Sequence, residues 1–525
     1  MPEAPPPTRS TVAAQRAGIG SGLLGRFEVS DPRNLQQYLP ILLAWIFWSA
    51  LALALMVTHE PWRDELQAWG LVRASGTPFD VLANSRHEGH PPLWFFTLWP
   101  VAKIVGDVVA MQVVTFVLGS IATWLTLRHM PVRLWLRIAV VFGYFPLYEF
   151  GVMSRNYSLA YALVVVFLWL SHRKGTSAWI PALVAFGIAS TAVNSLPLAI
   201  GLSFAVWGGP LFASRRRGPL DWKWIAPVLT FTALAAFVAL PAVGGGRKVR
   251  LDALTPAGLW DALAAPSRAL IPFSEFNNYV WGRPFVAGWP EIASALGILI
   301  VVGVAFALRH SRSALTIWLL TSILLPFIIV ITVMPLGPRY VSPFFSALLA
   351  AVWFASADRV ETPVSQRGVL SPVIALAAFA LVALSVWAGL TAAWTDLRSP
   401  FSGGEAAAEW IEANSEPDRP IIILCAINKA LCSSISIRLD APAYTSATGQ
   451  PFEFVDWTPS WKDQVPAYQA AAAARQLEAQ TGAQVFIVSS TVGAPPGCAS
   501  GHRTPSGTTN EYFIVCSSDQ LASID

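Results

Sequence analysis

The sequence has few charged residues, and this shortage narrows its class. Charged side chains make up 13% of the 525 residues, whereas hydrophobic residues make up 54%. An ordinary soluble protein carries about 25% charged residues. The mean hydropathy is +0.52, and several apolar runs exceed about 18 residues, the length needed to cross a bilayer. The chain is therefore predicted to be a polytopic α-helical membrane protein, and no basic patch of the kind that binds nucleic acid is present.

Cysteine is scarce, and all of it lies near the end of the chain. The four cysteines are Cys425, Cys432, Cys498 and Cys516. An even number confined to one soluble segment indicates disulfides and an oxidising compartment. Closeness in sequence favours the pairs Cys425–Cys432 and Cys498–Cys516, and four buried free thiols are the other interpretation.

Several other features are missing. The sequence shows no repeat of fixed period, no metal-binding motif and no glycine-rich nucleotide loop. Residues 1–36 lack the apolar core of a signal peptide and are rich in Pro, Ser, Gly and Arg, which predicts a disordered tail. The tail carries Arg9, Arg16, Arg26 and Arg33, so we expect it in the cytoplasm.

Eleven apolar runs are predicted to span the membrane. They are residues 38–58, 108–127, 134–152, 157–171, 177–193, 196–213, 224–243, 289–308, 313–334, 339–357 and 369–394. A further run, 91–106, is short and begins with two prolines. If it does not cross, the basic loops all face the cytoplasm, in agreement with the positive-inside rule. Topologies with twelve or thirteen spans remain alternatives.

The character of the sequence changes after residue 395. Helical patterns over 403–414 and 465–482 alternate with strand patterns over 419–427, 483–490 and 510–518. This alternation predicts a small α/β domain over 396–525. With eleven spans and a cytoplasmic N-terminus, the domain follows a transmembrane domain over 37–395 and lies in the periplasm or outside the cell.

The first outer loop, 59–90, concentrates ionisable residues in the stretches "THEPWRDELQAWG" (58–70) and "SRHEGHPPLWFF" (85–96). Trp62, Leu66 and Trp69 form one helical stripe, which predicts a helix lying along the membrane interface. Asp64 and Glu65 then project away from the stripe, and carboxylates at membrane level are usually functional. In the alternative interpretation, they cap the helix or pair with nearby arginines, Arg63 and Arg73.

Groups suited to a phosphate lie on the same face. His90 precedes two prolines at the mouth of an apolar segment, and Arg155 and Arg339 lie at the outer ends of spans. A guanidinium group fits a phosphate, although His90 bonded to backbone and Arg155 paired with Glu149 are the structural alternatives. Further candidates for substrate contact are Arg63, His87, Glu88, Asn156, Tyr157, Tyr340 and Lys248. Lys248 belongs to the basic loop "GGGRKVR" (244–250), which could equally contact lipid headgroups.

These residues resemble a known family. Asp64-Glu65, then Pro91-Pro92-Leu93, then Arg155-Asn156-Tyr157 resemble the motifs of GT-C glycosyltransferases. The closest patterns belong to the bacterial protein O-mannosyltransferase and aminoarabinose transferase group, similar to glycosyltransferase family 39. The resemblance covers roughly residues 38–395.

The resemblance implies a polyprenyl-phosphate sugar donor, transfer on the outer face, inversion at the anomeric carbon and Asp64 as the general base. Glu65 would support the site or contact the acceptor. Some relatives have a lysine before the "PPL" motif. This chain has His90, so Arg155 and Arg339 are the other candidates for holding the donor phosphate.

The predicted partners are the bilayer, the polyprenyl-phosphate sugar and a glycan, lipid or protein acceptor, in a bacterial inner (plasma) membrane. No cofactor is required, and a divalent metal ion is left open. Two other functions compete with transfer. A transporter or flippase of a lipid-linked glycan should show ionisable residues at mid-membrane in two related halves, and here they cluster at one face. A non-catalytic membrane subunit predicts that Asp64→Asn leaves activity intact.

Overall fold

The structure is a computed structural model. The part of the chain that it describes consists of residues 35–173, 175–177, 179–214, 249–273, 285–332, 334–361, 372–427, 429–445, 449–457, 467–489, 498, 502–504 and 511–521. The predicted tail up to residue 34, the predicted span 224–243 and the candidate Lys248 lie outside the described residues.

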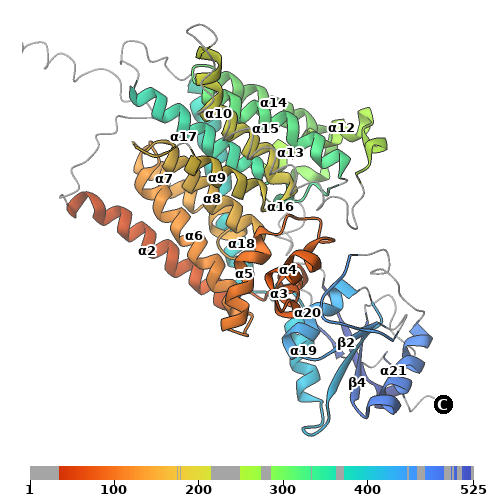
Figure 1. Cartoon of the computed structure of the whole chain (residues 1–525). Coiled ribbons are helices and arrows are strands. Elements are labelled where there is room, and N and C mark those ends of the chain that lie inside the picture. The colour runs from red at the N-terminus through yellow and green to blue at the C-terminus, as the bar shows by residue number, and fades with distance from the viewer. Residues whose placement is uncertain are drawn as a thin grey trace, which may run out of the picture.

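Helices make up the first part of the chain, as Figure 1 shows. They are α2 (Leu35–Thr58), α3 (Arg63–Ala74), α4 (Pro78–Ser85), α5 (Leu93–Ile104), α6 (Val109–His129), α7 (Leu134–Val141), α8 (Asn156–Ser171), α9 (Trp179–Ala189), α10 (Leu196–Ser214), α12 (Pro256–Ala262), α13 (Ala265–Leu270), α14 (Pro290–Leu308), α15 (Arg312–Ile331), α16 (Pro338–Val341), α17 (Pro343–Glu361) and α18 (Pro372–Asp396). Short π or 3₁₀ turns are η1 (Phe145–Glu149), η2 (Val193–Ser195), η3 (Leu251–Ala253) and η4 (Phe285–Gly288).

Six helical segments within the described residues are long and apolar enough to cross a membrane. They are α2, α6, α14, α15, α16 with α17, and α18. All six coincide with predicted spans. The helices α5, α8 and α9 are apolar but shorter, so the predicted count of eleven spans is not confirmed.

The predicted span 134–152 is broken in the structure. Helix α7 ends at Val141, and a π-helical turn, η1, follows at Phe145–Glu149. Pro146 cannot donate a backbone hydrogen bond, and Gly143 packs so closely on α18 that an added Cβ would lie 2.7 Å from Ser385 Oγ. These two residues explain why the apolar run does not form one straight helix.

The outer surfaces of the long helices are apolar. Leu43, Phe47 and Val57 of α2 are 56%, 63% and 80% exposed. Leu299 and Val302 of α14 are also exposed. Apolar surface of this extent on a soluble protein is unfavourable, and it is the surface that lipid tails cover. The helical part is therefore a multi-pass membrane domain.

The first outer loop folds into α3 and α4, which pack on α5. Helix α4 begins at a capping box, in which the Asp80 N–H donates to Thr77 Oγ1 (3.2 Å) and the Thr77 N–H donates to the Asp80 carboxylate (2.8 Å). The stripe predicted to face the interface is instead inside the protein, because Trp62, Leu66 and Trp69 are at most 2% exposed. Trp62 packs with the core of the helical bundle and Phe401, and Trp69 packs with residues of α5 and α6 and with Ile437, so protein rather than lipid covers the stripe. The position of α3 along a membrane interface stays a prediction.

The C-terminal part forms one mixed sheet with helices on both faces. Its helices are α19 (Gly404–Ala413), α20 (Lys429–Leu439), α21 (Ala467–Thr481) and α22 (Ser518–Leu521), and its strands are β1 (Ile421–Cys425), β2 (Ala443–Thr445), β3 (Pro451–Phe452), β4 (Gln484–Ser489), β5 (His502–Arg503) and β6 (Ile514–Ser517). The strand order is β3-β2-β1-β4-β6-β5, with β2, β1 and β4 parallel.

The two faces of the sheet have separate cores. Ile423 and Cys425 of β1 pack with α19 and α20, whereas Ile422 and Leu424 pack with α21. This alternation follows from the two-residue period of a strand. Disulfides join Cys425 to Cys432 and Cys498 to Cys516, which is the pairing favoured from the sequence. The helices and strands predicted for this region are confirmed within a few residues.

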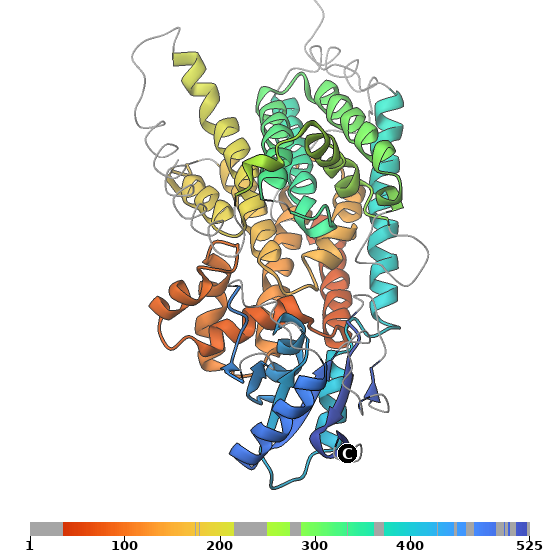
Figure 2. The ribbon, with the colours of Figure 1, turned by 90° about the vertical axis from the view of Figure 1, so that its right-hand side faces the viewer.

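The C-terminal domain sits at one end of the helical bundle, against the first outer loop (Figures 1 and 2). Helix α18 leads into it, and α20 lies along α3. The contact is close at Gly70 of α3, where an added Cβ would lie 2.6 Å from Ile437 Cδ1 and 3.2 Å from the Glu453 carbonyl oxygen. The outer loop is therefore enclosed between the membrane helices and the C-terminal domain.

Candidate functional site

The start of α3 presents the two neighbouring acids, Asp64 and Glu65. Trp62 precedes the helix in an extended conformation, and its N–H donates to Glu65 Oε2 at 3.1 Å. Acidic groups in the first turn are favoured by the helix dipole. Consecutive residues of a helix point in different directions, so the two carboxylates enter different environments.

Glu65 lies in a fully buried network. Its Oε1 accepts from the Ser154 N–H at 2.5 Å, and its Oε2 lies 3.1 Å from His59 Nε2. The other ring nitrogen of His59 lies 3.0 Å from Asp396 Oδ2. Burial lowers the pKa of His59, but Asp396 and Glu65 outweigh it and raise the pKa to about 10. Glu65 thereby ties α3 to the end of α2, to α18 and to the segment before Arg155, which is the contact pattern of a supporting residue.

Asp64 faces a cluster of three arginines. Its Oδ2 lies 2.7 Å from Arg339 Nη1 and 3.8 Å from Arg155 Nη2, and its Oδ1 lies 3.6 Å from Arg63 Nε. Arg155 also donates to the Asp64 backbone carbonyl. Burial raises the pKa of Asp64, but Arg339, Arg155 and Arg63 together lower it to about 2. Asp64 is therefore ionised at neutral pH and held from three sides.

Each arginine comes from a different part of the fold. Arg63 belongs to α3, Arg155 immediately precedes α8, and Arg339 belongs to α16. The guanidinium of Arg339 also lies over the rings of Trp62 and Tyr340, at 5.1 and 4.7 Å from their centroids. Arg155 pairs with Asp64, whereas Glu149 accepts a hydrogen bond from Tyr144 at 3.0 Å. Residues about 275 positions apart in sequence thus converge on one carboxylate.

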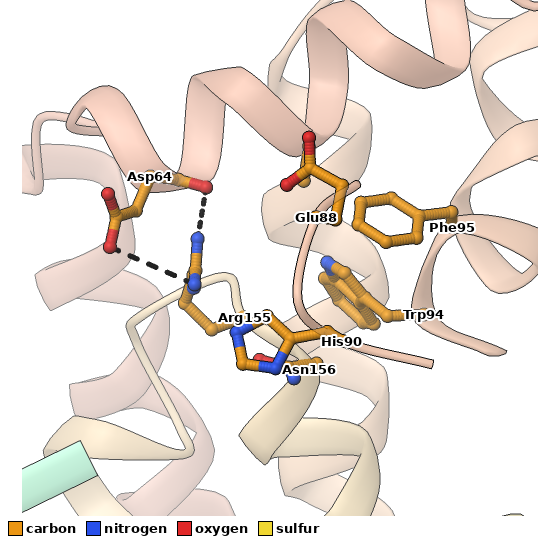
Figure 3. A pocket seen from close by; sticks show the side chains of 8 residues that line it. Asp64, Glu88, His90, Trp94, Phe95, Arg155 and Asn156 are labelled. Carbon is orange, nitrogen blue, oxygen red and sulfur yellow. Dashed lines mark hydrogen bonds and ion pairs between the residues drawn. The ribbon is translucent and has the colours of Figure 1, made fainter. Parts of the chain in front are cut away.

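A pocket opens beside this cluster (Figure 3). Its lining residues are Asp64, Ala68, Glu88, His90, Trp94, Phe95, Arg155 and Asn156. Charged groups form one side, and the Trp94 and Phe95 rings form another. Such a mixture suits a ligand that has a charged head and an apolar body.

The turn before α5 places His90 in this pocket. Gly89 has φ +71°, a conformation that a side chain disfavours, and α5 begins only after Pro91 and Pro92. The His90 ring meets the Tyr157 ring edge-on, with centroids 6.3 Å apart. Glu88 accepts from Gln67 Nε2 at 2.7 Å, and burial raises its pKa to about 7.

The remaining candidates are distributed around the pocket or away from it. Asn156 lines it and donates to the Thr191 carbonyl at 2.8 Å. Tyr157 is buried against His90, and the Tyr340 carbonyl accepts from Asn194 Nδ2 at 2.8 Å. His87 accepts from Arg86 at 3.0 Å and is not among the lining residues. The structure therefore brings most, but not all, of the predicted residues together.

The C-terminal domain contributes residues to the rim that the sequence interpretation did not identify. Gln67 exchanges two hydrogen bonds of 2.8 Å with the Val455 backbone, and the nearby Trp457 acts to lower the pKa of Glu88 against the effect of burial. Glu511 Oε1 lies 3.2 Å from Arg63 Nε. Burial raises the pKa of Glu511 to about 7. No local pattern marks these residues, because only the docking of the two domains gives them their role.

Metal binding was left open by the sequence. Among the described residues, no group of three or more His, Cys, Asp or Glu side chains is arranged to hold a metal ion. Asp64 is surrounded by guanidinium groups rather than by further oxygen ligands, a setting that favours an anion.

No protein-family model and no curated protein matches the chain. The solved structures that are similar to it include two of ArnT from Cupriavidus metallidurans. The structure bound to undecaprenyl phosphate shows 13% identity and a TM-score of 0.45, with 92% of this chain and 97% of that chain covered. The apo structure shows 14% identity and a TM-score of 0.43, with 90% and 97% covered. ArnT is an aminoarabinose transferase, the group that the sequence motifs resemble.

Proposed function

We propose that the protein is a membrane glycosyltransferase that moves a sugar from a polyprenyl phosphate to an acceptor at the outer face of a bacterial inner membrane. The observation that carries the proposal is the convergence of Arg63, Arg155 and Arg339 on Asp64 beside a partly apolar pocket. The charged groups suit a sugar phosphate, and the apolar wall suits the start of a lipid chain.

In this proposal, the donor phosphate binds to Arg155 and Arg339, with His90 beside them. Guanidinium groups bind phosphate through charge-assisted hydrogen bonds, and they stabilise the negative charge that develops when the sugar–phosphate bond breaks. Both arginines are now paired with Asp64. A bound phosphate would share these cations and so weaken their hold on the carboxylate.

When the phosphate takes up part of the arginine charge, Asp64 becomes a better proton acceptor and can act as the base. Asp64 accepts the proton of the acceptor hydroxyl while the acceptor oxygen attacks the anomeric carbon from the side opposite the phosphate. The bond from the anomeric carbon to the phosphate oxygen breaks, and polyprenyl phosphate leaves with the electron pair. The configuration is inverted, and Asp64 then releases its proton to water. General-base catalysis of this kind typically contributes about 10²–10⁴-fold in rate.

We also place the C-terminal domain on the outer face, where the disulfides Cys425–Cys432 and Cys498–Cys516 suit an oxidising compartment. The acceptor, a glycan, a lipid or a protein, then approaches between this domain and the outer loop. Its proposed contacts are His87, Glu88, Asn156, Tyr157, Tyr340 and Lys248.

The test is a panel of synthetic polyprenyl-phosphate sugars incubated with purified protein, with release of polyprenyl phosphate as the readout. Consumption of one donor in the presence of cell-envelope extract as acceptor source is the expected result. The proposal fails if the protein binds polyprenyl phosphate but consumes no donor of the panel with any extract. Binding without turnover is what a carrier or flippase predicts.

A further inference from the structure

Arg63 connects the proposed base to the C-terminal domain. Its Nε lies 3.6 Å from Asp64 Oδ1 and 3.2 Å from Glu511 Oε1, so one guanidinium is shared by two carboxyl groups. Glu511 comes from the segment just before β6, more than four hundred residues further along the chain. The base is therefore only one side chain away from the soluble domain.

Glu511 is held in place from its own domain. Its side chain is 1% exposed. Its Oε2 accepts from the Ser402 hydroxyl at 2.7 Å, and its carbonyl oxygen accepts from the Gly403 N–H at 3.1 Å. On its other side, its Oε1 faces the guanidinium of Arg63, the first residue of α3. A buried carboxyl fixed on both sides has little freedom to leave Arg63.

The contact of Arg63 with both Asp64 and Glu511 determines how strongly the Arg63 charge stabilises the ionised form of Asp64. The Arg63 guanidinium interacts with both Asp64 and Glu511, so its interaction with Asp64 is weaker than it would be without Glu511. Without Glu511, Asp64 is the carboxylate that remains for Arg63 among the described residues. A base that is clamped more tightly by cations is a weaker proton acceptor.

We propose that Glu511 is a positioning residue for sugar transfer: by holding Arg63, it keeps Asp64 available as the base, so that the enzyme is competent only with its C-terminal domain seated on α3. This inference rests on the proposed function and adds a role for the soluble domain in the chemical step. The seating itself uses other contacts, such as that of Arg438 with the Pro61 carbonyl at 2.8 Å.

The experiment compares Glu511→Gln with wild type, measuring kcat and the donor KM separately. At about pH 8, above the pKa of about 7 of Glu511, we expect kcat to fall about tenfold or more, in the range of lost acid–base assistance, with a lower donor KM. The KM is not expected to rise, because the substitution removes a negative charge next to the phosphate site. Glu511→Asp, which keeps the charge, is expected to recover part of kcat.

Glu416→Gln is the matched control. Glu416 pairs with Arg419 at 3.4 Å within the C-terminal domain, so the kinetics of this variant should equal those of wild type. In the double variant Arg63→Gln/Glu511→Gln, kcat should equal that of Arg63→Gln alone, since both changes act through one contact. The inference is overturned if kcat is unchanged in Glu511→Gln, or if kcat and donor affinity fall together with the melting temperature.

A separate readout keeps this inference distinct from the proposed function. If wild-type protein consumes no donor, the affinity for undecaprenyl phosphate is measured instead. Glu511→Gln is then expected to bind it several-fold more tightly than wild type, whereas Glu416→Gln is expected to bind it as wild type does. Equal binding by Glu511→Gln and wild type contradicts the role of Glu511, whatever the reaction.

Discussion

Asp64→Asn is expected to abolish sugar transfer and, at the same time, to tighten the binding of polyprenyl phosphate. The carboxylate and the phosphate compete for Arg155 and Arg339, which now contact Asp64. Two unit charges about 5 Å apart interact by roughly 3 kcal/mol at an effective dielectric constant of about 20. The Asp64 side chain is 18% exposed, so solvent reduces this repulsion, and we expect about 1–2 kcal/mol. That corresponds to about 5- to 30-fold in Kd.

The assay is a titration of undecaprenyl phosphate into purified protein in lipid nanodiscs. Arg339→Gln provides the opposite expectation, since loss of a charged hydrogen bond costs about 1.5–3 kcal/mol and weakens binding. Asp80→Asn is the matched control, because Asp80 has the same charge in the same loop but caps α4. If Asp64→Asn weakens phosphate binding as Arg339→Gln does, Asp64 supports the phosphate site and the competition argument is refuted.

Three further predictions concern the supports of the site. His59→Leu is expected to lower the melting temperature, because removal of one partner of a buried ion pair costs about 3–5 kcal/mol. The pKa of His59 is raised to about 10, so the stabilisation from His59 is complete below about pH 6.5 and disappears as the pH rises through 10. A difference in melting temperature between wild type and His59→Leu that stays constant from pH 7 to 10 would contradict this. The pKa of Glu88 is raised to about 7, so wild type should lose stability relative to Glu88→Gln between about pH 4.5 and 7, and parallel melting curves would exclude this ionisation. Gly70→Val is expected to speed proteolysis between the domains, because an added Cβ lies 2.6 Å from Ile437; Gly106→Val, with nothing within 4 Å, is the control, and equal proteolysis of both refutes the close docking.

The membrane class and the location of the site follow from the sequence because both depend on local signals. Long apolar runs predict the helices that cross, and ionisable groups gathered at membrane level beside such runs are usually functional. The sequence predicted that Asp64, Arg155 and Arg339 lie on the same outer face. It did not predict that the three side chains contact one another. Their contacts within 4 Å arise from helices that meet in three dimensions, which no spacing rule describes.

Prediction from the sequence was incomplete where segments far apart in the chain determine the surroundings of a residue. The stripe of Trp62, Leu66 and Trp69 has the pattern of an interfacial helix, but it is buried in protein, against the helical bundle, Phe401 and Ile437. Helix α20, which makes that contact, was missed although Ile435 and Leu439 have helical spacing behind Cys432. Glu511 carries no local signal at all, since an acid in a short loop before a strand is ordinary.

Transfer of a labelled sugar from polyprenyl phosphate by wild type, Asp64→Asn and Asp80→Asn, measured side by side, decides whether Asp64 is the base. We predict transfer by wild type and Asp80→Asn, and a loss of at least about 10²-fold in Asp64→Asn while that variant still binds polyprenyl phosphate. Transfer by Asp64→Asn at the wild-type rate would contradict the assignment of this carboxylate as the base.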